Sequence, residues 1–345
     1  MILVTGATGH IGNVLVRELL KQGMKVRALV PPGEDRSPLA GLAVEVVEGD
    51  VLDPASLEAA MRGVTVVYHL AGLISILPGP DPRLRRVNVE GTANVLRAAR
   101  AAGVRRLIYT SSIHAIARPN TPGTIDETLA FDPRTALSEY DRSKAEASLA
   151  VLRAVEEGLD AVIVCPTGVI GPHDYRLSEM GRVIRDAIEA PVLFSVQGGY
   201  DFVDVRDVAR GEIQACEAGR AGESYILSGD RLEVARLLET VQEITGVRRP
   251  ILHIPHSVAR LAAALAPLYS KLTRRKPRFT PYALSTVAGN SVISHAKATR
   301  AFGYHPRLLR ETIADTVGWF TESRRALAPQ PVVTSRVPPQ RRDRR

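Results

Sequence analysis

Short apolar runs alternate with longer amphipathic stretches over the first 165 residues of the chain. The stretch 83–102 places apolar residues at spacings of three and four, which is typical of a helix. Runs such as 162–164 are apolar throughout, as expected for strands buried on both faces of a parallel sheet. Expected strands occupy 2–5, 25–30, 44–48, 64–70, 105–111 and 161–165, and further helices occupy 10–22 and 137–157. This alternation predicts an α/β fold of the Rossmann type, a doubly wound parallel sheet covered by helices.

The pattern changes after residue 165, where prolines recur, strands shorten and helices dominate. We therefore expect a dinucleotide-binding domain over 1–165 and a smaller, mainly helical C-terminal substrate domain over 166–200 and 231–325. Segments near 201–230 are expected to return to the first domain and its sheet. The segment 326–345 has five arginines against one aspartate and few large apolar residues, which predicts a disordered basic tail.

Composition excludes several classes of protein. Of 345 residues 45% are apolar, and two cysteines without CxxC spacing exclude a disulfide scaffold and a structural zinc site. We expect no metal and a reducing, cytoplasmic location. No uncharged apolar run approaches 18 residues, and Met1 leads directly into a strand, so neither a spanning helix nor a targeting peptide is expected. Half of the net charge of +8 lies in the tail, and without a recognisable module it does not predict nucleic-acid binding.

A glycine-rich segment, TGATGHIG at 5–12, joins the first strand to the first helix. Glycines at this spacing permit a tight turn, close approach to a pyrophosphate and close packing of helix on sheet. Free amides and the helix dipole then favour the phosphates. The position between strand and helix predicts a dinucleotide site, and the expected contacts are Gly6, Ala7, Thr8, Gly9, His10, Ile11 and Gly12.

The partner of the adenosine ribose is open. An acid at the end of the second strand binds a 2′-hydroxyl, whereas an arginine binds a 2′-phosphate. The strand ends at Val30, which is neither. Arg36 is a candidate for a phosphate, Glu34 or Asp35 for a hydroxyl, and a solvated loop is the third alternative. The missing acid removes repulsion toward NADP, so we expect NADP or NAD with a slight preference for NADP.

Tyr140 and Lys144 lie four residues apart, on one face of an expected helix that Ser138 caps with Asp141 completing a capping box. A nearby ammonium stabilises phenolate and brings a tyrosine toward acid–base use. Ser112 ends the fifth strand, at the edge where ligands bind in open parallel sheets. A surface tyrosine beside an exposed lysine is the alternative, but the preceding phosphate loop favours a catalytic set.

These motifs resemble, in this order, the extended short-chain dehydrogenase/reductase family over about residues 1–325. The resemblance implies that Tyr140 is the acid/base, Lys144 its electrostatic partner and Ser112 the substrate-oxygen donor, with Ser111 as a less favoured alternative. It also implies a possible homodimer through helices 83–102 and 137–157. The motifs include Tyr109-Thr110-Ser111-Ser112, PTGVIGP at 166–172 and FVDVRDVA at 202–209. The implied cofactor contacts are Asp50, Val51, Leu70, Ala71, Gly72, Tyr140, Lys144, Pro166, Thr167, Gly168 and Val169.

Two departures from the sugar-nucleotide members of that family indicate a branch. Those enzymes usually have asparagine where this chain has Gly168 and a phosphate-binding arginine where it has Tyr200. A diphosphate needs charge-assisted donors. The sequence is similar to the dihydroflavonol-reductase and 3β-hydroxysteroid-dehydrogenase-like branch. We expect hydride transfer between nicotinamide and a ketone or secondary alcohol of an apolar small molecule, and a sugar-nucleotide epimerase or dehydratase is the alternative.

Several other residues have weaker signals. The ring of His10 is expected to point outward, and His69 is expected to be packed rather than chemical. His114 is a candidate for the substrate site or a plain loop residue, and Tyr175 and Tyr200 are candidates for the substrate site or for packing. Residues 257–272 form an amphipathic pattern followed by a basic cluster at 274–278, which favours a helix capping the substrate domain over one lying on a membrane.

Overall fold

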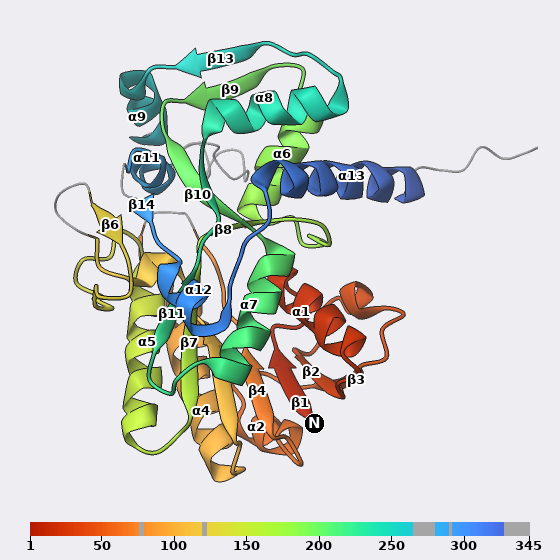
Figure 1. Ribbon diagram of the computed structural model, residues 1–345, viewed down its shortest axis with the longest axis vertical. Helices are drawn as coiled ribbons and strands as arrows, with labels where there is room; N and C mark the ends of the chain where they lie inside the picture. The colour runs from red at the N-terminus through yellow and green to blue at the C-terminus, as the bar shows by residue number, and fades with distance from the viewer. Residues whose placement is uncertain (76–78, 119–122, 265–279, 290–291, 328–345) are drawn as a thin grey trace, which may run out of the picture.

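The computed structural model describes residues 1–75, 79–118, 123–264, 280–289 and 292–327. Figure 1 shows a sheet with helices on both sides in its lower half and a second part above it. The basic cluster 274–278, the second half of the pattern at 257–272, and nearly all of the expected tail 326–345 lie outside the described residues.

Seven parallel strands form the main sheet, in the spatial order β11-β7-β5-β4-β1-β2-β3. All six strands expected before residue 166 are confirmed. The strand order reverses between β1 and β4, and ligands of open parallel sheets bind outside the carboxyl ends at such a point. The strands are β1 (Ile2–Thr5), β2 (Val26–Val30), β3 (Glu45–Glu48), β4 (Val66–His69), β5 (Arg106–Thr110), β7 (Ala161–Pro166) and β11 (Ser224–Leu227).

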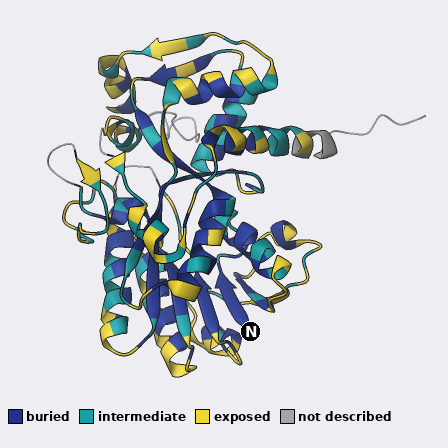
Figure 2. Cartoon of the chain, viewed as in Figure 1, coloured by how far each residue is buried: buried dark blue, intermediate teal, exposed yellow. Residues whose placement is uncertain are grey.

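Alternate strand side chains enter two cores, one on each face of the sheet. Val4 belongs to one core and its neighbour Leu3 to the other. Figure 2 shows the strands of the main sheet as largely buried, so the predicted doubly wound arrangement is confirmed. The first core is covered by α1 (His10–Lys21), α7 (Val205–Ala218) and α12 (Ala296–Phe302), and the second by α2 (Pro54–Ala60), α4 (Thr92–Ala101) and α5 (Glu139–Glu156).

The helix expected over 83–102 is continuous but not uniform. It runs as α3 (Pro82–Arg85), a π-helical turn (Arg86–Gly91) and then α4. A Cβ on Gly91 would lie 2.7 Å from Val51 Cγ2, so glycine permits the helix to approach the loop after β3. Single π-helical turns inside helices occur frequently at functional sites, and this one contains the buried Asn88.

The second part contains more strand than expected. Residues 201–204, expected to return to the main sheet, lie in a separate three-stranded sheet, and only 224–227 returns. Here β10 pairs in parallel with β8 and antiparallel with β12, so this strand has a partner on both edges. The elements are β8 (Gly168–Ile170), β9 (Leu193–Val196), β10 (Gly199–Asp204), β12 (Asp230–Glu233), β13 (Ile251–Ile254), α6 (Glu179–Glu189), α8 (Val234–Thr245), α9 (His256–Ala264), α11 (Pro281–Val287) and α13 (Leu309–Leu327), and β6 (Thr124–Ile125) pairs with β14 (Val292–Ile293).

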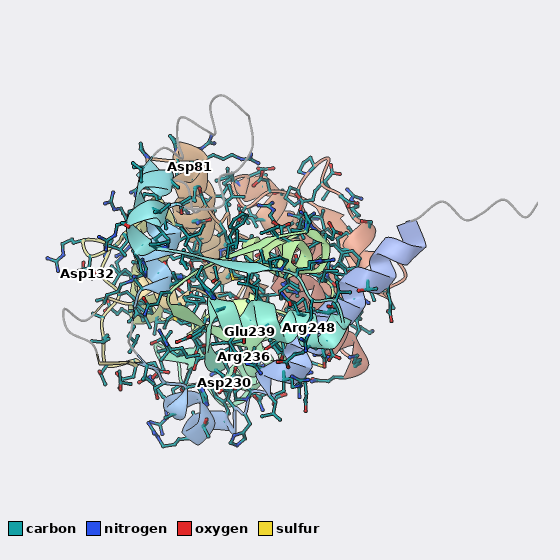
Figure 3. The ribbon with its side chains drawn as sticks, turned by 90° about the horizontal axis from the view of Figure 1, so that it is seen from above. Asp81, Asp132, Asp230, Arg236, Glu239 and Arg248 are labelled. Atoms are coloured by element: carbon teal, nitrogen blue, oxygen red, sulfur yellow. The ribbon has the colours of Figure 1, made fainter. Side chains whose placement is uncertain are left out.

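The outer face of α8 is charged. Arg236 pairs with Glu239 and Glu243 at 3.2 and 2.7 Å, and Arg310 of α13 joins Glu243 at 2.6 Å. Figure 3 labels Arg236 and Glu239 on this helix. These four side chains are exposed, so this face is the solvent side of the second part. Exposed pairs of this kind contribute little to the free energy of unfolding. Among the described helices, none is both long and apolar enough to cross a bilayer.

Candidate active site

Parallel strands bring the predicted site residues to one edge of the sheet. The strands β1, β4, β5 and β7 are parallel, and they are neighbours in the sheet in the order β7-β5-β4-β1. The segments that follow them therefore share the carboxyl edge. These segments are 6–12, 70–72, 111–112 and 167–169.

The loop after β1 is a tight turn that glycine permits. Gly6 has a φ of 70°, and a Cβ there would lie 2.7 Å from the Ala71 nitrogen. A Cβ on Gly12 would lie 2.2 Å from the Gly6 carbonyl oxygen. Gly9 is the N-cap of α1 and supplies no capping side chain, so the first-turn amides are left to an external acceptor. A dinucleotide diphosphate fits this terminus, because free amides and the helix dipole favour an anion.

His10 belongs to this turn, but its ring has a structural partner. His10 Nε2 lies 3.0 Å from the Pro172 carbonyl oxygen, in the loop after β8. A carbonyl only accepts, so Nε2 carries the proton. The expectation that the ring points outward is wrong. Burial lowers the pKa of His10, which keeps the imidazole neutral at pH 7.

The residues expected at the adenosine ribose separate in the structure. Arg36 extends along the surface and pairs with Glu48 of β3 at 2.6 Å. Glu34 turns toward the phosphate loop and accepts a bond of 2.8 Å from Thr8 Oγ1. Arg176, in the loop after β8, donates to the same Thr8 oxygen at 2.7 Å and pairs with Glu34. Sequence reasoning missed Arg176, since no local signal shows that a residue 168 positions later returns to this loop.

Asp50 and Val51 begin the loop after β3. Asp50 Oδ1 accepts a bond of 2.9 Å from the Leu52 amide, so the carboxylate shapes the turn. Val51 is buried against Gly91 of the π-helical turn. Because β3 runs parallel to β2, the two residues lie at the carboxyl edge of the sheet, and their contact with an adenine stays a prediction.

Asn88 joins two predicted site segments and was missed by sequence reasoning. Its Oδ1 accepts from the Leu73 amide at 2.7 Å, and its Nδ2 donates to the Leu73 carbonyl and to Ser143 Oγ, each at 3.0 Å. A Cβ on Gly72 would lie 3.2 Å from Asn88 Oδ1 and 3.5 Å from Lys144 Nζ. Asn88 thus holds the segment 70–72 against α5. The available signal was a polar residue on the apolar face of the expected helix, four residues after Leu84 and three before Gly91.

His69, at the end of β4, links backbone segments. Thr5 Oγ1 accepts from the Ala71 amide at 3.1 Å and donates to His69 Nδ1 at 2.7 Å, because the proton of the neutral ring is on Nε2. Thr92 Oγ1 donates to the Asn88 carbonyl at 2.6 Å and accepts from His69 Nε2 at 3.0 Å. Burial lowers the pKa of His69 to about 3. The ring is a neutral, packed connector, as expected.

Tyr140 and Lys144 lie one turn apart on the buried face of α5. Ser138 Oγ accepts from the Asp141 amide at 3.1 Å and donates to Asp141 Oδ1 at 2.9 Å, so the expected cap is confirmed. Tyr140 is 8% exposed and Lys144 6% exposed, which excludes a pair on the helix surface. Lys144 Nζ donates to the Thr110 carbonyl at 2.7 Å.

Burial controls the protonation of this pair. It raises the pKa of Tyr140 to about 12, although a hydrogen bond with Ser112 opposes the rise. Burial lowers the pKa of Lys144 to about 8. The pKa of the phenol is therefore raised and not lowered as expected, because burial is the largest contribution and Nζ donates to the Thr110 carbonyl in this arrangement. Tyr140 therefore carries its proton at neutral pH.

The two serines after β5 have different partners. Ser148 donates to the Lys144 carbonyl at 2.8 Å, so Ser111 is the donor in its 2.7 Å bond to Ser148. The Ser111 proton is thereby used within the protein. Ser112 accepts from the His114 amide at 3.2 Å and lies close enough to Tyr140 to oppose the rise in the phenol pKa. The structure thus pairs Ser112, and not Ser111, with Tyr140.

The segment 166–169 is held by Asp201. Thr167 Oγ1 and the Gly229 amide donate to Asp201 Oδ1, at 2.6 and 3.0 Å. Burial raises the pKa of Asp201 to about 6. Beside it, a Cβ on Gly168 would lie 2.6 Å from Tyr200 Cε1. The two positions at which the chain departs from sugar-nucleotide enzymes are therefore in contact.

A directed chain of hydrogen bonds ends at the Tyr200 hydroxyl. Arg118 donates to His114 Nδ1 at 3.2 Å, so His114 Nε2 is the donor in its 2.7 Å bond to Tyr200. Burial lowers the pKa of His114 to about 4, which keeps it neutral. The Tyr200 proton is left for another acceptor. The ring of Tyr282 lies 5.7 Å from His114, and its hydroxyl donates to Asp141 at 2.7 Å, so these aromatic residues adjoin the helix that carries Tyr140.

A buried glutamate lies across the sheet from Lys144. Glu212 of α7 is fully buried, and its Oε1 accepts from Thr110 Oγ1 at 2.8 Å. Among the described residues, Glu212 Oε2 has no hydrogen-bond partner. Burial raises the pKa of Glu212 to about 8. Thr110 thus connects the two charged residues: its side chain donates to Glu212, and its backbone carbonyl accepts from Lys144. The spacing of residues along the helices did not reveal this connection.

The fold and the site define an oxidoreductase that uses a nicotinamide dinucleotide. A family model described as "NAD dependent epimerase/dehydratase family" matches residues 2–228. The chain belongs to this family, the extended short-chain dehydrogenases/reductases, as the motifs predicted, and is an NAD(P)-dependent enzyme of it.

Three similar proteins align with nearly the whole length of this chain. Sterol demethylase protein B of Methylococcus capsulatus is 38% identical, over 93% of this chain and 98% of its own length. A candidate dihydroflavonol 4-reductase of Synechocystis sp. is 32% identical, over 92% and 93%. Among solved structures, gox2253 is 34% identical with a TM-score of 0.80, over 94% of this chain and 98% of its own.

Proposed function

We propose that this enzyme reduces a ketone on an apolar, ring-containing small molecule, or oxidises the matching alcohol, with NADPH or NADP. Tyr140 is the acid/base, Lys144 its electrostatic partner and Ser112 the second donor to the substrate oxygen. The observation that carries the proposal is the buried, protonated Tyr140, which lies beside the buried Ser112 and one helical turn from the buried Lys144, at the sheet edge that also holds the phosphate loop.

In the direction of reduction, the hydroxyls of Ser112 and Tyr140 bind the carbonyl oxygen and polarise its bond to carbon. Tyr140 transfers its proton to that oxygen as the alcohol forms. The ammonium of Lys144 stabilises the phenolate that remains. The nicotinamide ring supplies or accepts the hydride when the cofactor is bound. Proton transfer of this kind contributes roughly 10²–10⁴-fold in rate.

The substrate class is inferred from the walls beside Tyr140. Tyr200, Tyr282 and His114 are neutral and aromatic, and Tyr200 stands where sugar-nucleotide enzymes place an arginine. A diphosphate would find no charge-assisted donor at that position. Relatives named for a sterol and for a dihydroflavonol agree with an apolar ring system. We therefore favour reduction over sugar-nucleotide epimerisation or dehydration.

The preference for NADP is inferred from the loop after β2. Val30 ends the strand without a carboxylate, and the nearby Glu34 is already paired with Arg176. Neither residue therefore presents an uncompensated negative charge to a 2′-phosphate. An acid free to bind the 2′-hydroxyl would favour NAD.

The test compares wild type with Tyr140→Phe on a panel of cyclic ketones and on UDP- and dTDP-sugars. We expect wild type to consume NADPH in proportion to the ketone reduced. The variant should bind NADPH with unchanged affinity and lose at least about 100-fold in turnover. Sugar-nucleotide conversion without net consumption of cofactor would support the alternative. Ketone reduction retained by Tyr140→Phe would contradict the assigned acid.

A further inference from the structure

The loop after β8, residues 171–178, is fastened to α1. Asn13 Nδ2 donates to the His173 carbonyl at 3.2 Å, and Arg17 donates to the Tyr175 hydroxyl at 3.3 Å. Tyr175, a candidate for the substrate site, therefore contacts α1 through Arg17. His173 and Leu177 have φ values of 68° and 54°. Left-handed backbone is unfavourable for such residues and clusters at functional sites.

The side chain placed there is Arg176. Its guanidinium reaches Thr8 of the phosphate loop and Glu34 of the loop after β2, and Thr8 in turn donates to Glu34. In dinucleotide-binding sheets the adenosine ribose lies between these two loops. An acid and an arginine, the two residue types that read its 2′ position, thus meet there as a pair. Arg176 is 46% exposed and Glu34 24% exposed, so the pair is open to a ligand.

We propose that Arg176, supplied by the segment that leads into the second part, binds the 2′-phosphate of NADPH. This inference rests on the proposed use of NADP. A guanidinium matches phosphate geometry with two parallel N–H groups, and the Thr8 hydroxyl is a further donor beside it. Glu34 holds Arg176 in place and competes with the phosphate for its guanidinium. Arg36, the arginine expected from sequence, is directed to Glu48 and away from Thr8.

The Arg176–Glu34 pair also allows the same site to bind NAD and NADP in different ways. With NAD, the Arg176–Glu34 pair stays closed, and Glu34 faces the 2′-hydroxyl with its charge compensated. With NADP, the phosphate shares Arg176 with the carboxylate, so the charge of Glu34 stays compensated. Removal of the arginine therefore affects the phosphorylated cofactor, whereas removal of the acid releases the arginine for it.

The experiment measures Kd for NADPH, NADH, 2′,5′-ADP and 5′-ADP by calorimetry, without substrate. The variants are Arg176→Met, which keeps the apolar stem, Glu34→Gln, and Arg36→Met as the matched control. We expect Arg176→Met to weaken NADPH and 2′,5′-ADP by about tenfold or more, with NADH and 5′-ADP within about twofold. Glu34→Gln should tighten NADPH several-fold. Arg36→Met should change neither ratio.

Equal weakening of all four ligands by Arg176→Met would assign the residue to loop structure or to the diphosphate and overturn the proposal. An unchanged NADPH affinity, or a selective loss in Arg36→Met, would overturn it as well. The wild-type ratio of the NADPH and NADH affinities tests the cofactor preference of the proposed function, whereas the change in that ratio tests Arg176. Thermal unfolding of each variant without ligand checks that the fold is retained.

Discussion

The ring of Tyr200 fills the space that a side chain at position 168 would need. A Cβ on Gly168 would lie 2.6 Å from Tyr200 Cε1 and 2.7 Å from Tyr200 Cδ1. The two departures from the sugar-nucleotide pattern are therefore one feature, in which the loss of the asparagine side chain at 168 admits an aromatic ring from 200. The site consequently has an aromatic wall in place of an amide and a guanidinium.

Gly168→Ala should destabilise the protein by about 1–3 kcal/mol, because the added methyl must displace a packed ring. Tyr200→Ala removes the ring but not the Asp201 carbonyl oxygen, which lies 2.9 Å from the same Cβ position. The loss from Gly168→Ala should therefore become smaller in the double variant without vanishing. Urea unfolding of the two single variants and the double variant measures this coupling. Gly318→Ala is the matched control, since no atom lies within 4 Å of its Cβ position, and it should be neutral or slightly stabilising. If the losses in the free energy of unfolding of the two single variants simply add in the double variant, contact with the Tyr200 ring is not what destabilises Gly168→Ala.

Tyr200→Phe should raise KM for an oxygenated cyclic ketone by about three- to tenfold and leave kcat within about twofold. The reason is the direction of the hydrogen bond between His114 and Tyr200. His114 is the donor, so the phenol proton of Tyr200 is free for a substrate oxygen. Steady-state kinetics at saturating NADPH measure both constants. A ketone without a second oxygen should show no such rise, and Tyr175→Phe, altered at an exposed ring bonded to Arg17, should behave like wild type. A fall in kcat alone would instead place Tyr200 in the chemical step.

The rate of ketone reduction should fall as pH rises through about 8. Burial lowers the pKa of Lys144 to about 8, so its ammonium is present below that pH and is lost above it. Without the ammonium, the phenolate of Tyr140 loses its stabilising charge. Profiles of kcat from pH 6 to 10 measure the effect. Lys144→Arg keeps a charge throughout, so its rate should be lower but without the fall near pH 8, and a wild-type profile flat to pH 10 would contradict the assignment.

The sheet, its helices and its carboxyl edge were predictable because their signals are local. Apolar runs such as 162–164 specify buried parallel strands, and the glycines of 6–12 specify a turn at a helix terminus. Ser138 was recognisable as a cap from its position before the helix. These features depend on neighbours in the sequence, so spacing and residue type suffice.

The features that were missed depend on contacts between distant segments. Arg176 returns to Thr8 across 168 positions, and Glu212 reaches Thr110 across 102. The pKa of Tyr140 was predicted with the wrong sign because helical spacing shows the ammonium but does not show the extent of burial. Residues 201–204 were assigned to the main sheet because a short strand-like segment does not specify which strand it pairs with.

Glu212→Gln tests whether a buried carboxyl beneath Lys144 limits stability at alkaline pH. Burial raises the pKa of Glu212 from 4.5 to about 8. A raised pKa in the folded state contributes stability that is complete below about 4.5 and is lost as pH rises toward 8, because the unfolded chain releases the proton first. Glutamine does not titrate, yet it still accepts the bond from Thr110. The free energy of unfolding of wild type should therefore decline relative to the variant between pH 5 and 8.

Urea unfolding at pH 5, 6.5 and 8 measures this difference for Glu212→Gln. Glu239→Gln is the matched control, because Glu239 is an exposed partner of Arg236 on α8, and its difference from wild type should stay constant with pH. The same constancy for Glu212→Gln would mean that Glu212 stays ionised in the folded protein, held as a buried ion pair with Lys144. In that case the pKa of Lys144 would rise above 8, and the fall in reduction rate would move to higher pH in parallel, so the two measurements check each other.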